Sequence, residues 1–356
     1  MTYLSITNDV LNELNEVEIT ANVSTARSVQ KFVGKAVNKA INDIYNAELE
    51  WPFAYSFGSQ SLTAGIQEYA LPSDYRYVDW DSCYLTSTDL VTNGSYTSNI
   101  TSWTDLSSGT GSAAYTSTGN GRARFAAGAS GVAGLEQSVA TVSGSDYRVK
   151  FRTFTGTISA TVGTATTLSD IKSSTDFTVD NVGDGQFHEF TFTATSATSF
   201  LGFRSTVNAN HDLDFVEIKF DLTPVKLDYM DVEEWESTLK ADEDNQAATD
   251  HSTPTIVFAT RNDKFGVSDI PDRSDISVEF DYWATHTDMS ADSDTHSIPA
   301  RFEFVIKERV LYYAYRFRQD MLAAKDADDN YTKGVEKMRT EIINKPTSFR
   351  SRTGGV

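Results

Sequence analysis

Residues 26–53 read ARSVQKFVGKAVNKAINDIYNAELEWPF, and their apolar side chains recur every three to four residues. This spacing puts the apolar side chains on one face of an α-helix. We expect the helix over Thr25–Tyr45, with Ser24 as its N-cap. A second face carries lysines at four-residue steps, namely Lys31, Lys35 and Lys39. The stretch therefore predicts a long amphipathic helix that packs into the core of a folded domain.

Further helices are predicted at both ends of the chain. A shorter helix comes before the first one, and the residues on its apolar side are Ile6, Val10, Leu14 and Val17. Pro299 stands where a first-turn proline belongs, and an apolar stripe follows it from Phe302 to Met321. A last amphipathic helix has apolar residues at steps of four, three and four, namely Tyr331, Val335, Met338 and Ile342.

Strands are predicted between these helices and the middle of the chain. SQSLT (59–63) and IQEYALP (66–72) flank Ala64-Gly65, which predicts a hairpin. TIVFAT (255–260) and KFGVS (264–268) predict a second hairpin in the same way. DISVEFDYW (275–283) alternates as a half-buried strand does.

The middle segment, residues 90–222, differs in composition from both flanks. It is rich in Ser, Thr and Gly and contains no proline. Short β-rich runs such as DYRVKFRTF (146–154) and FHEFTFTAT (187–195) are separated by clusters of Gly, Ser or Asn. Their spacing is typical of an all-β sandwich. We interpret the segment as a sandwich inserted into another domain.

The fold class that follows is α+β, with helices at both ends of an outer domain that also has a small antiparallel β portion. We expect three parts. The outer domain is discontinuous and comprises residues 1–89 and 223–344. The inserted sandwich comprises residues 90–222, and a flexible basic tail comprises residues 345–356.

Composition excludes several classes of function. The 356 residues carry 50 acidic and 30 basic side chains, a formal charge of −20, which argues against general nucleic-acid binding. Apolar runs fall short of the roughly 20 residues that cross a bilayer, and no signal peptide is recognisable. Cys83 is the single cysteine, and the five histidines are scattered, so no zinc or Ser-His-Asp site is predicted. We expect a cytosolically made protein that is not an enzyme and needs no cofactor.

The charge is unevenly distributed along the chain. Residues 223–297 hold 18 acids against 5 bases, a net charge of −13. Residues 298–356 hold 8 acids against 12 bases, a net charge of +4. The C-terminus is therefore a basic end on an acidic protein.

With the insert removed, the flanks resemble a known family. The motifs that carry the resemblance are Trp51-Pro-Phe53, Tyr69-Ala-Leu-Pro-Ser-Asp74, Tyr282-Trp283 and Ile298-Pro299, in this order and spacing. They are similar to the head-to-tail adaptor (connector) proteins of tailed bacteriophages, the family that includes the tail tubular A proteins of podoviruses. The match covers roughly residues 1–88 and 223–356.

The adaptor resemblance implies a structural protein at the head–tail junction of a virion. Such proteins form a ring of twelve copies beneath the portal, attach the tail nozzle or fibres, and leave a channel through which genomic DNA passes without specific binding. It also implies that the C-terminal segment reaches the portal, and the candidate docking residues here are Lys345, Phe349, Arg350 and Arg352. An electronegative channel lining would repel the phosphates of DNA, and we assign it mainly to residues 223–297.

The insert resembles a second family, the jelly-roll carbohydrate-binding modules that accompany xylanases. The matching motifs are Asn93-Gly94 followed by Trp103, Leu135–Val139, Gly144–Phe151, Phe187–Phe192 and Asp212–Ile218. The resemblance implies stacking of aromatic rings on host or virion glycans, for which the candidates are Trp103, Tyr115, Tyr147 and Phe154. Trp103 and Tyr147 fit a core role at least as well.

Many of these modules hold a structural calcium ion, and Asp214 fits the position of the last ligand. The opening acidic positions are occupied here by Ser95 and Thr97, so we expect calcium at Asp214 to be weak or absent. Three functions remain open. They are the structural adaptor, a glycan-binding receptor or tail-fibre-attachment protein acting through residues 90–222, and a polysaccharide-cleaving enzyme without a nominated acid/base pair.

Overall fold

The computed structural model describes residues 1–118, 121–154, 156–179, 185–243 and 245–343. The chain divides into two compact units. The first unit comprises residues 1–58, 71–80 and those from 280 onward, and the second comprises residues 59–70 and 81–279. The predicted α+β class is confirmed, since helices lie towards both ends of the chain and β-sheets lie between them.

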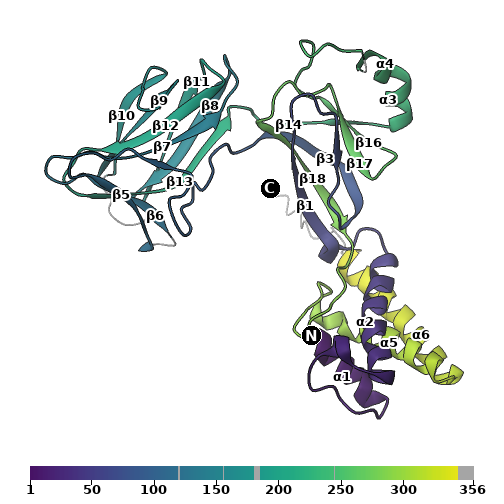
Figure 1. Ribbon diagram of the computed structural model, residues 1–356. Coiled ribbons are helices and arrows are strands. Elements are labelled where there is room, and N and C mark those ends of the chain that lie inside the picture. The colour runs from purple at the N-terminus through teal and green to yellow at the C-terminus, as the bar shows by residue number, and fades with distance from the viewer. Residues whose placement is uncertain (119–120, 155, 180–184, 244, 344–356) are drawn as a thin grey trace, which may run out of the picture. The chain divides into compact units, whose positions relative to one another are not determined.

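Four long helices form most of the first unit (Figure 1). They are α1 (Tyr3–Glu13), α2 (Ser28–Asn46), α5 (Glu303–Phe317) and α6 (Met321–Met338). Shorter 3₁₀ turns span Val23–Thr25, Pro52–Ala54 and Ala300–Phe302, and a π-helical turn spans Arg339–Ile343. α5 is the central helix because it packs against α1, α2 and α6. Within the described residues, no helix is long and apolar enough to cross a membrane.

The helical spacing correctly predicts the buried faces, with differences at the helix ends. Ser24 is not the N-cap of α2, because Val23–Thr25 forms a separate 3₁₀ turn and the cap position falls on Arg27. Val17 is exposed, since α1 ends at Glu13. Phe317 and Met321 are likewise exposed at the turn between α5 and α6, although they continue the apolar stripe in sequence.

The strands outside residues 90–222 form two four-stranded sheets. The first has the order β1-β18-β3-β14, with β1 at Tyr55–Ser61, β18 at Ile276–Ala284, β3 at Tyr75–Ser87 and β14 at Val225–Lys226. The second has the order β15-β16-β17-β2, with β15 at Asp228–Met230, β16 at Ile256–Ala259, β17 at Lys264–Ser268 and β2 at Glu68–Ala70. The short helices α3 (Val232–Thr238) and α4 (Lys240–Glu243) lie between β15 and β16 in the chain.

One hairpin prediction is correct and the other is wrong. β16 and β17 pair as an antiparallel hairpin, as predicted around residues 261–263. The strands on either side of Ala64-Gly65 do not pair with each other, because β1 joins the sheet of β18 and β2 pairs with β17. Gly65 does turn, with φ at +78°, but the turn leads from one sheet to another.

The insert is a sandwich of two five-stranded sheets (Figure 1). One sheet has the order β10-β9-β12-β7-β4, whose strands span Lys172–Thr178, Thr157–Gly163, Thr198–Ser205, Ala133–Ala140 and Thr104–Asp105. The other has the order β11-β8-β13-β6-β5, whose strands span Gln186–Thr193, Asp146–Thr153, Asn210–Phe220, Arg122–Ala126 and Ser112–Thr116. Inward side chains of both sheets, including Phe151 and Phe203 with ring centroids 5.0 Å apart, form one core.

The two ends of the insert lie close together, as an inserted domain requires. The backbone N–H of Leu90 donates to the carbonyl of Ile218 at 2.9 Å. The carboxylate of Asp89 accepts from the N–H groups of Val91 and Ile218, at 3.0 and 3.1 Å. Burial raises the pKa of Asp89 above its ordinary value, although these backbone donors act in the opposite direction.

A buried ion pair connects the sandwich to the loop before β18. Arg273 donates to Asp275 from Nε and Nη2, at 2.5 and 2.7 Å. The hydroxyl of Tyr147, in β8, donates to the same carboxylate at 2.5 Å, and the guanidinium lies 3.4 Å from the ring centroid of Phe220. Burial acts to raise the pKa of Asp275, but the hydrogen bonds from Arg273 and Tyr147 outweigh it, so the pKa of this carboxyl lies below its ordinary value.

We predict that Arg273→Ala destabilises the second unit strongly. The substitution leaves the carboxylate of Asp275 buried without its cation, a change that costs about 3–5 kcal/mol. Tyr147→Phe removes one hydrogen bond and keeps the ion pair, so its cost should be about 1–3 kcal/mol. Urea unfolding followed by fluorescence measures both. If Arg273→Ala is as stable as the wild type, the ion pair does not stabilise the second unit.

Candidate functional site

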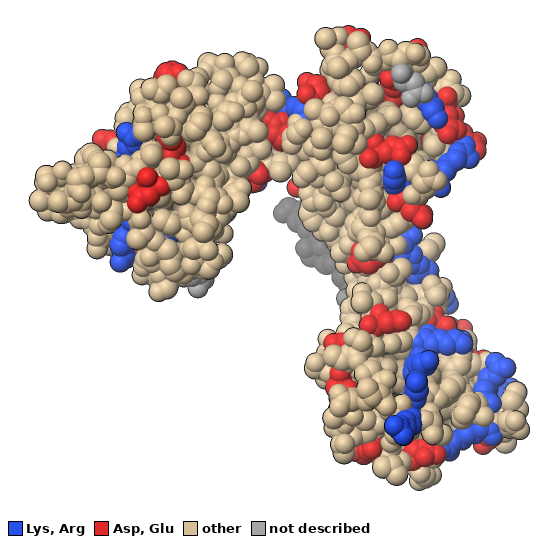
Figure 2. Space-filling view, in the orientation of Figure 1, with Lys and Arg blue, Asp and Glu red and all other residues tan. Residues whose placement is uncertain are grey.

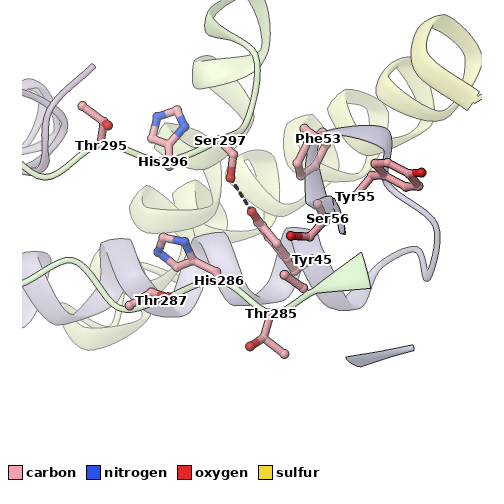
Figure 3. A pocket seen from close by; sticks show the side chains of 12 residues that line it. Tyr45, Phe53, Tyr55, Ser56, Thr285, His286, Thr287, Thr295, His296 and Ser297 are labelled. Atoms are coloured by element: carbon pink, nitrogen blue, oxygen red, sulfur yellow. Dashed lines mark hydrogen bonds between the residues drawn. The ribbon is translucent and has the colours of Figure 1, made fainter. Parts of the chain in front are cut away.

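A pocket of 240 Å³ opens in the helical unit (Figure 3). Its walls come from three places in the chain: the end of α2, the segment that leads into β1, and the loop between β18 and α5. Apart from Ala54 and Ala284, the lining side chains are polar or aromatic, namely Tyr45, Phe53, Tyr55, Ser56, Thr285, His286, Thr287, Thr295, His296 and Ser297. These positions are far apart in sequence, so the pocket is a product of the tertiary fold.

Two histidines of this pocket have pKa values below the ordinary value of histidine. The side chain of His296 is 2% exposed, and neither of its ring nitrogens has a hydrogen-bond partner of normal geometry among the described residues. Burial lowers the pKa of His296, and the N-terminal amine lowers it further, against the influence of Glu303. Burial also lowers the pKa of His286, and the neighbouring Asp288 opposes this change.

The pocket lacks the hydrogen bonds that would activate a nucleophile. The hydroxyls of Tyr45 and Ser297 lie 2.7 Å apart and bond to each other (Figure 3). Within the described part of the chain, no hydrogen bond joins His286 or His296 to a hydroxyl group. A nucleophile–base pair needs such a bond, so this arrangement offers a polar recess rather than a catalytic dyad.

The four aromatic candidates for glycan stacking are mostly inside the sandwich. Tyr147 is 0% exposed, Phe154 is 4% exposed and Trp103 is 7% exposed. Their ring faces are covered by protein in this structure. Tyr115, in β5, is half-buried, and its hydroxyl donates to the carbonyl of Thr97 at 3.4 Å. Of the four, Tyr115 alone keeps part of its side chain accessible.

The surroundings of Asp214 do not fit a calcium site. The side chain is partly buried, and burial raises its pKa, while Arg122 and Arg152 supply the opposing positive charge. In the described parts of the chain, no group of three or more His, Cys, Asp or Glu side chains could hold a metal ion. Calcium prefers six to eight oxygen ligands, whereas Asp214 has two guanidinium groups in its vicinity.

The four portal-docking candidates, Lys345, Phe349, Arg350 and Arg352, lie outside the described residues. Three of the twelve bases of residues 298–356 are Lys345, Arg350 and Arg352, so the described residues 298–343 hold 9 bases against 8 acids.

One surface of the sandwich has features that the residue types alone did not single out. Phe187, in β11, is 51% exposed, and its ring meets that of Phe215 edge to face at 5.5 Å. The ammonium of Lys150 lies 5.1 Å from the centroid of Phe187, and the guanidinium of Arg152 lies 5.4 Å from it. The alternation of FHEFTFT could have revealed Phe187, since it is out of phase with the inward Phe190 and Phe192.

Comparison with protein families gives one match. Residues 136–352, more than half of this chain, match the model of the family described as SU10 adaptor protein. The matched region begins inside the sandwich and includes α3 to α6. No curated protein sequence matches the chain.

Some solved structures are similar to part of this chain at low identity. One is the enzymatically active domain of tailspike protein 4 from bacteriophage CBA120, at 17% identity and a TM-score of 0.31; the likeness covers 37% of this chain and 21% of the tailspike chain. Another is TmCBM61 in complex with beta-1,4-galactotriose, at 15% identity and a TM-score of 0.29, covering 38% and 100%. A third, from Clostridium thermocellum, is the CBM22-1-GH10 part of xylanase 10B with xylohexaose, at 11% identity and a TM-score of 0.29, covering 38% and 29%.

We predict that the helical unit loses stability as the pH falls from about 7.5 to about 5. An unfolded histidine titrates near pH 6.5, whereas burial keeps His286 and His296 neutral to lower pH. Below about pH 6.5 the unfolded chain therefore binds more protons, and the stability present above that pH is lost. Scanning calorimetry at several pH values measures the effect. A chain with His286→Gln and His296→Gln should lose less stability over this range, whereas His251→Gln, in the other unit, should behave as the wild type.

Proposed function

Because this chain belongs to the SU10 adaptor protein family, it is a phage virion adaptor with partners among the virion proteins, and we propose that it acts at the head–tail junction. In this proposal, copies of the chain form a ring of twelve beneath the portal, attach the tail nozzle or fibres, and surround the channel for genomic DNA. The resemblance read from the sequence is confirmed at the level of a phage adaptor.

The family match over residues 136–352 is the observation that carries the proposal. The described structure adds support from the helical unit, whose helices α2 and α6 each keep an exposed face beside α5. Among the acidic residues of 223–297, those of α3 and its cap are exposed, namely Asp231, Glu233, Glu234 and Glu236. They are the acids best suited to a lining that repels phosphate.

Portal docking is assigned to residues 345–356. The segment holds Lys345, Arg350 and Arg352 around Phe349 and has no acidic residue. A short basic segment with one aromatic side chain suits an acidic surface with an apolar recess.

We predict that the purified chain assembles with its portal protein and that Arg350→Glu with Arg352→Glu weakens this binding about tenfold or more. The two charge reversals should leave the ring itself unchanged, since the docking segment is proposed to contact the portal. Negative-stain imaging and co-sedimentation measure ring and complex. A matched control is Lys172→Glu with Lys226→Glu, which makes the same charge change within the second unit. A chain that stays monomeric even with portal would contradict the adaptor proposal.

Glycan binding by the sandwich is a second candidate, favoured by the exposed pair Phe187 and Phe215. Two accessible rings beside Lys150 and Arg152 combine a stacking surface with hydrogen-bond donors, which is the chemistry that recognises sugars. Tyr115 remains a candidate, and Trp103, Tyr147 and Phe154 would need to become exposed first.

We predict that Phe187→Ala and Phe215→Ala each lower the affinity for a host polysaccharide several-fold, because each removes a ring face. Binding of the full chain to a glycan array provides the measurement. Leu168→Ala, another exposed apolar residue of the sandwich, is the control. If the wild-type chain binds no polysaccharide of the host surface, the glycan proposal is wrong and the adaptor proposal stands.

A further inference from the structure

Helix α2 presents a row of lysines that the described structure does not neutralise. Lys31, Lys35 and Lys39 are exposed and four residues apart, so they lie along one side of the helix. Figure 2 shows a column of basic side chains over α2 in the helical unit. Lys39 is placed 4.2 Å from the ring centroid of Tyr313. Lys31 and Lys35 form no ion pair with any residue that the structure describes.

An apolar groove lies beside this row. Its volume is 480 Å³, and its lining includes Val29, Phe32 and Phe317 together with the stems of Lys31 and Lys35. The rings of Phe32 and Phe317 stack at 4.5 Å, yet Phe317 remains 56% exposed. An exposed aromatic pair framed by unpaired cations suits a partner with one apolar and several acidic side chains.

The outer face of α6 carries such a set. Leu322 is 75% exposed, and Asp326 and Asp329 follow it at steps of four and three, which keeps all three on one side of the helix. Neither carboxylate has an ion pair within the described residues. The opposite side of α6, with Ala324 and Ala327, is buried.

The lysine row of α2 and the Leu322–Asp329 face of α6 do not contact each other within one chain, because α5 packs between these two helices. Arg309, on α5, reaches Asp43 of α2 at 2.6 Å and Asp328 of α6 at 2.7 Å. Both α2 and α6 pack extensively on α5. The lysine row and the Leu322–Asp329 face therefore stay unpaired in a single copy.

We propose that the α2 face of one copy, Lys31 and Lys35 with the Phe32–Phe317 groove, receives the α6 face of the next copy, Leu322 with Asp326 and Asp329. Leu322 enters the groove and the carboxylates face the lysines. Such a contact joins two different surfaces, so repeating it builds a ring when the rotation closes. This inference rests on the proposed ring and names its interface.

A second copy is the occupant because one helix of this same chain offers the complementary apolar and acidic side chains. Packing α2 against α2 of another copy would instead place lysines against lysines. Exposed ion pairs contribute only about 0.2–1 kcal/mol each, so burial of the aromatic and leucine side chains drives the contact. The charges fix which face meets which.

Charge reversal tests the pairing in the full-length chain. One variant has Lys31→Glu and Lys35→Glu, and the other has Asp326→Lys and Asp329→Lys. For each alone we expect the concentration at half-assembly to rise about tenfold or more, as measured by mass photometry and sedimentation. All four changes in one chain, or a mixture of the two variants, should restore assembly, because each reversed face then meets a reversed partner. Leu322→Asp should also weaken assembly. Because Leu322 is exposed, this substitution should not unfold the chain, so a loss of assembly would come from the interface.

The control carries Lys172→Glu and Lys226→Glu, which change the total charge as the α2 variant does but lie in the second unit. If the wild-type chain forms rings and either reversed variant assembles equally well, this interface is wrong while the adaptor proposal stands. Two weakened variants that do not rescue each other would also overturn the pairing. A wild-type chain that never assembles, alone or with portal, overturns the ring and this interface together.

Discussion

The buried ion pair of Arg273 and Asp275 is the interaction on which the second unit depends most. The sandwich leaves and re-enters the rest of the chain through only two connections, near Asp89 and after Phe220. Such connections set where the insert begins but place little restraint on it. The carboxylate of Asp275 adds that restraint, because it accepts from Arg273 and from the buried hydroxyl of Tyr147 in β8.

A buried ion pair differs from an apolar contact in the free-energy cost of breaking it. An apolar contact that separates leaves two surfaces that water covers at a modest cost. When one partner of a buried ion pair is lost, the other stays uncompensated in a medium of low dielectric constant. The pair therefore contributes little net stability but strongly disfavours arrangements that break it. Tyr147 belongs to the same arrangement, since burial, then its bond to Asp275, raises the pKa of its hydroxyl to about 12.

The sequence predicted what local periodicity determines and missed what distant partners determine. The helix faces and the strands of the sandwich follow from spacings of 3.6 and 2, so they could be predicted. The turn at Gly65 was also recognisable, but its strands find partners far away: the N–H of Leu62 donates to Ile276, more than 200 residues along the chain. The pocket that contains His286 and His296 could not be predicted for the same reason, since its lining residues are far apart in sequence. By contrast, the alternation within β8 places Tyr147 inward with Val149 and Phe151, so the core role that the sequence left open beside a stacking role could be read from the strand pattern.

The net charge of −20 opposes association of copies only at long range. At physiological ionic strength a charge is screened within about 8 Å, so total charge has little influence on two surfaces already near contact. At that distance the side chains on the two surfaces determine whether they attract or repel each other. The charge of the α2 surface is positive, whereas the net charge of the whole chain is negative. Lys31 and Lys35 are exposed beside Phe317 and form no ion pair with the described residues of their own copy. Their arrangement is explained when the face is completed by acidic side chains from outside the copy that carries it.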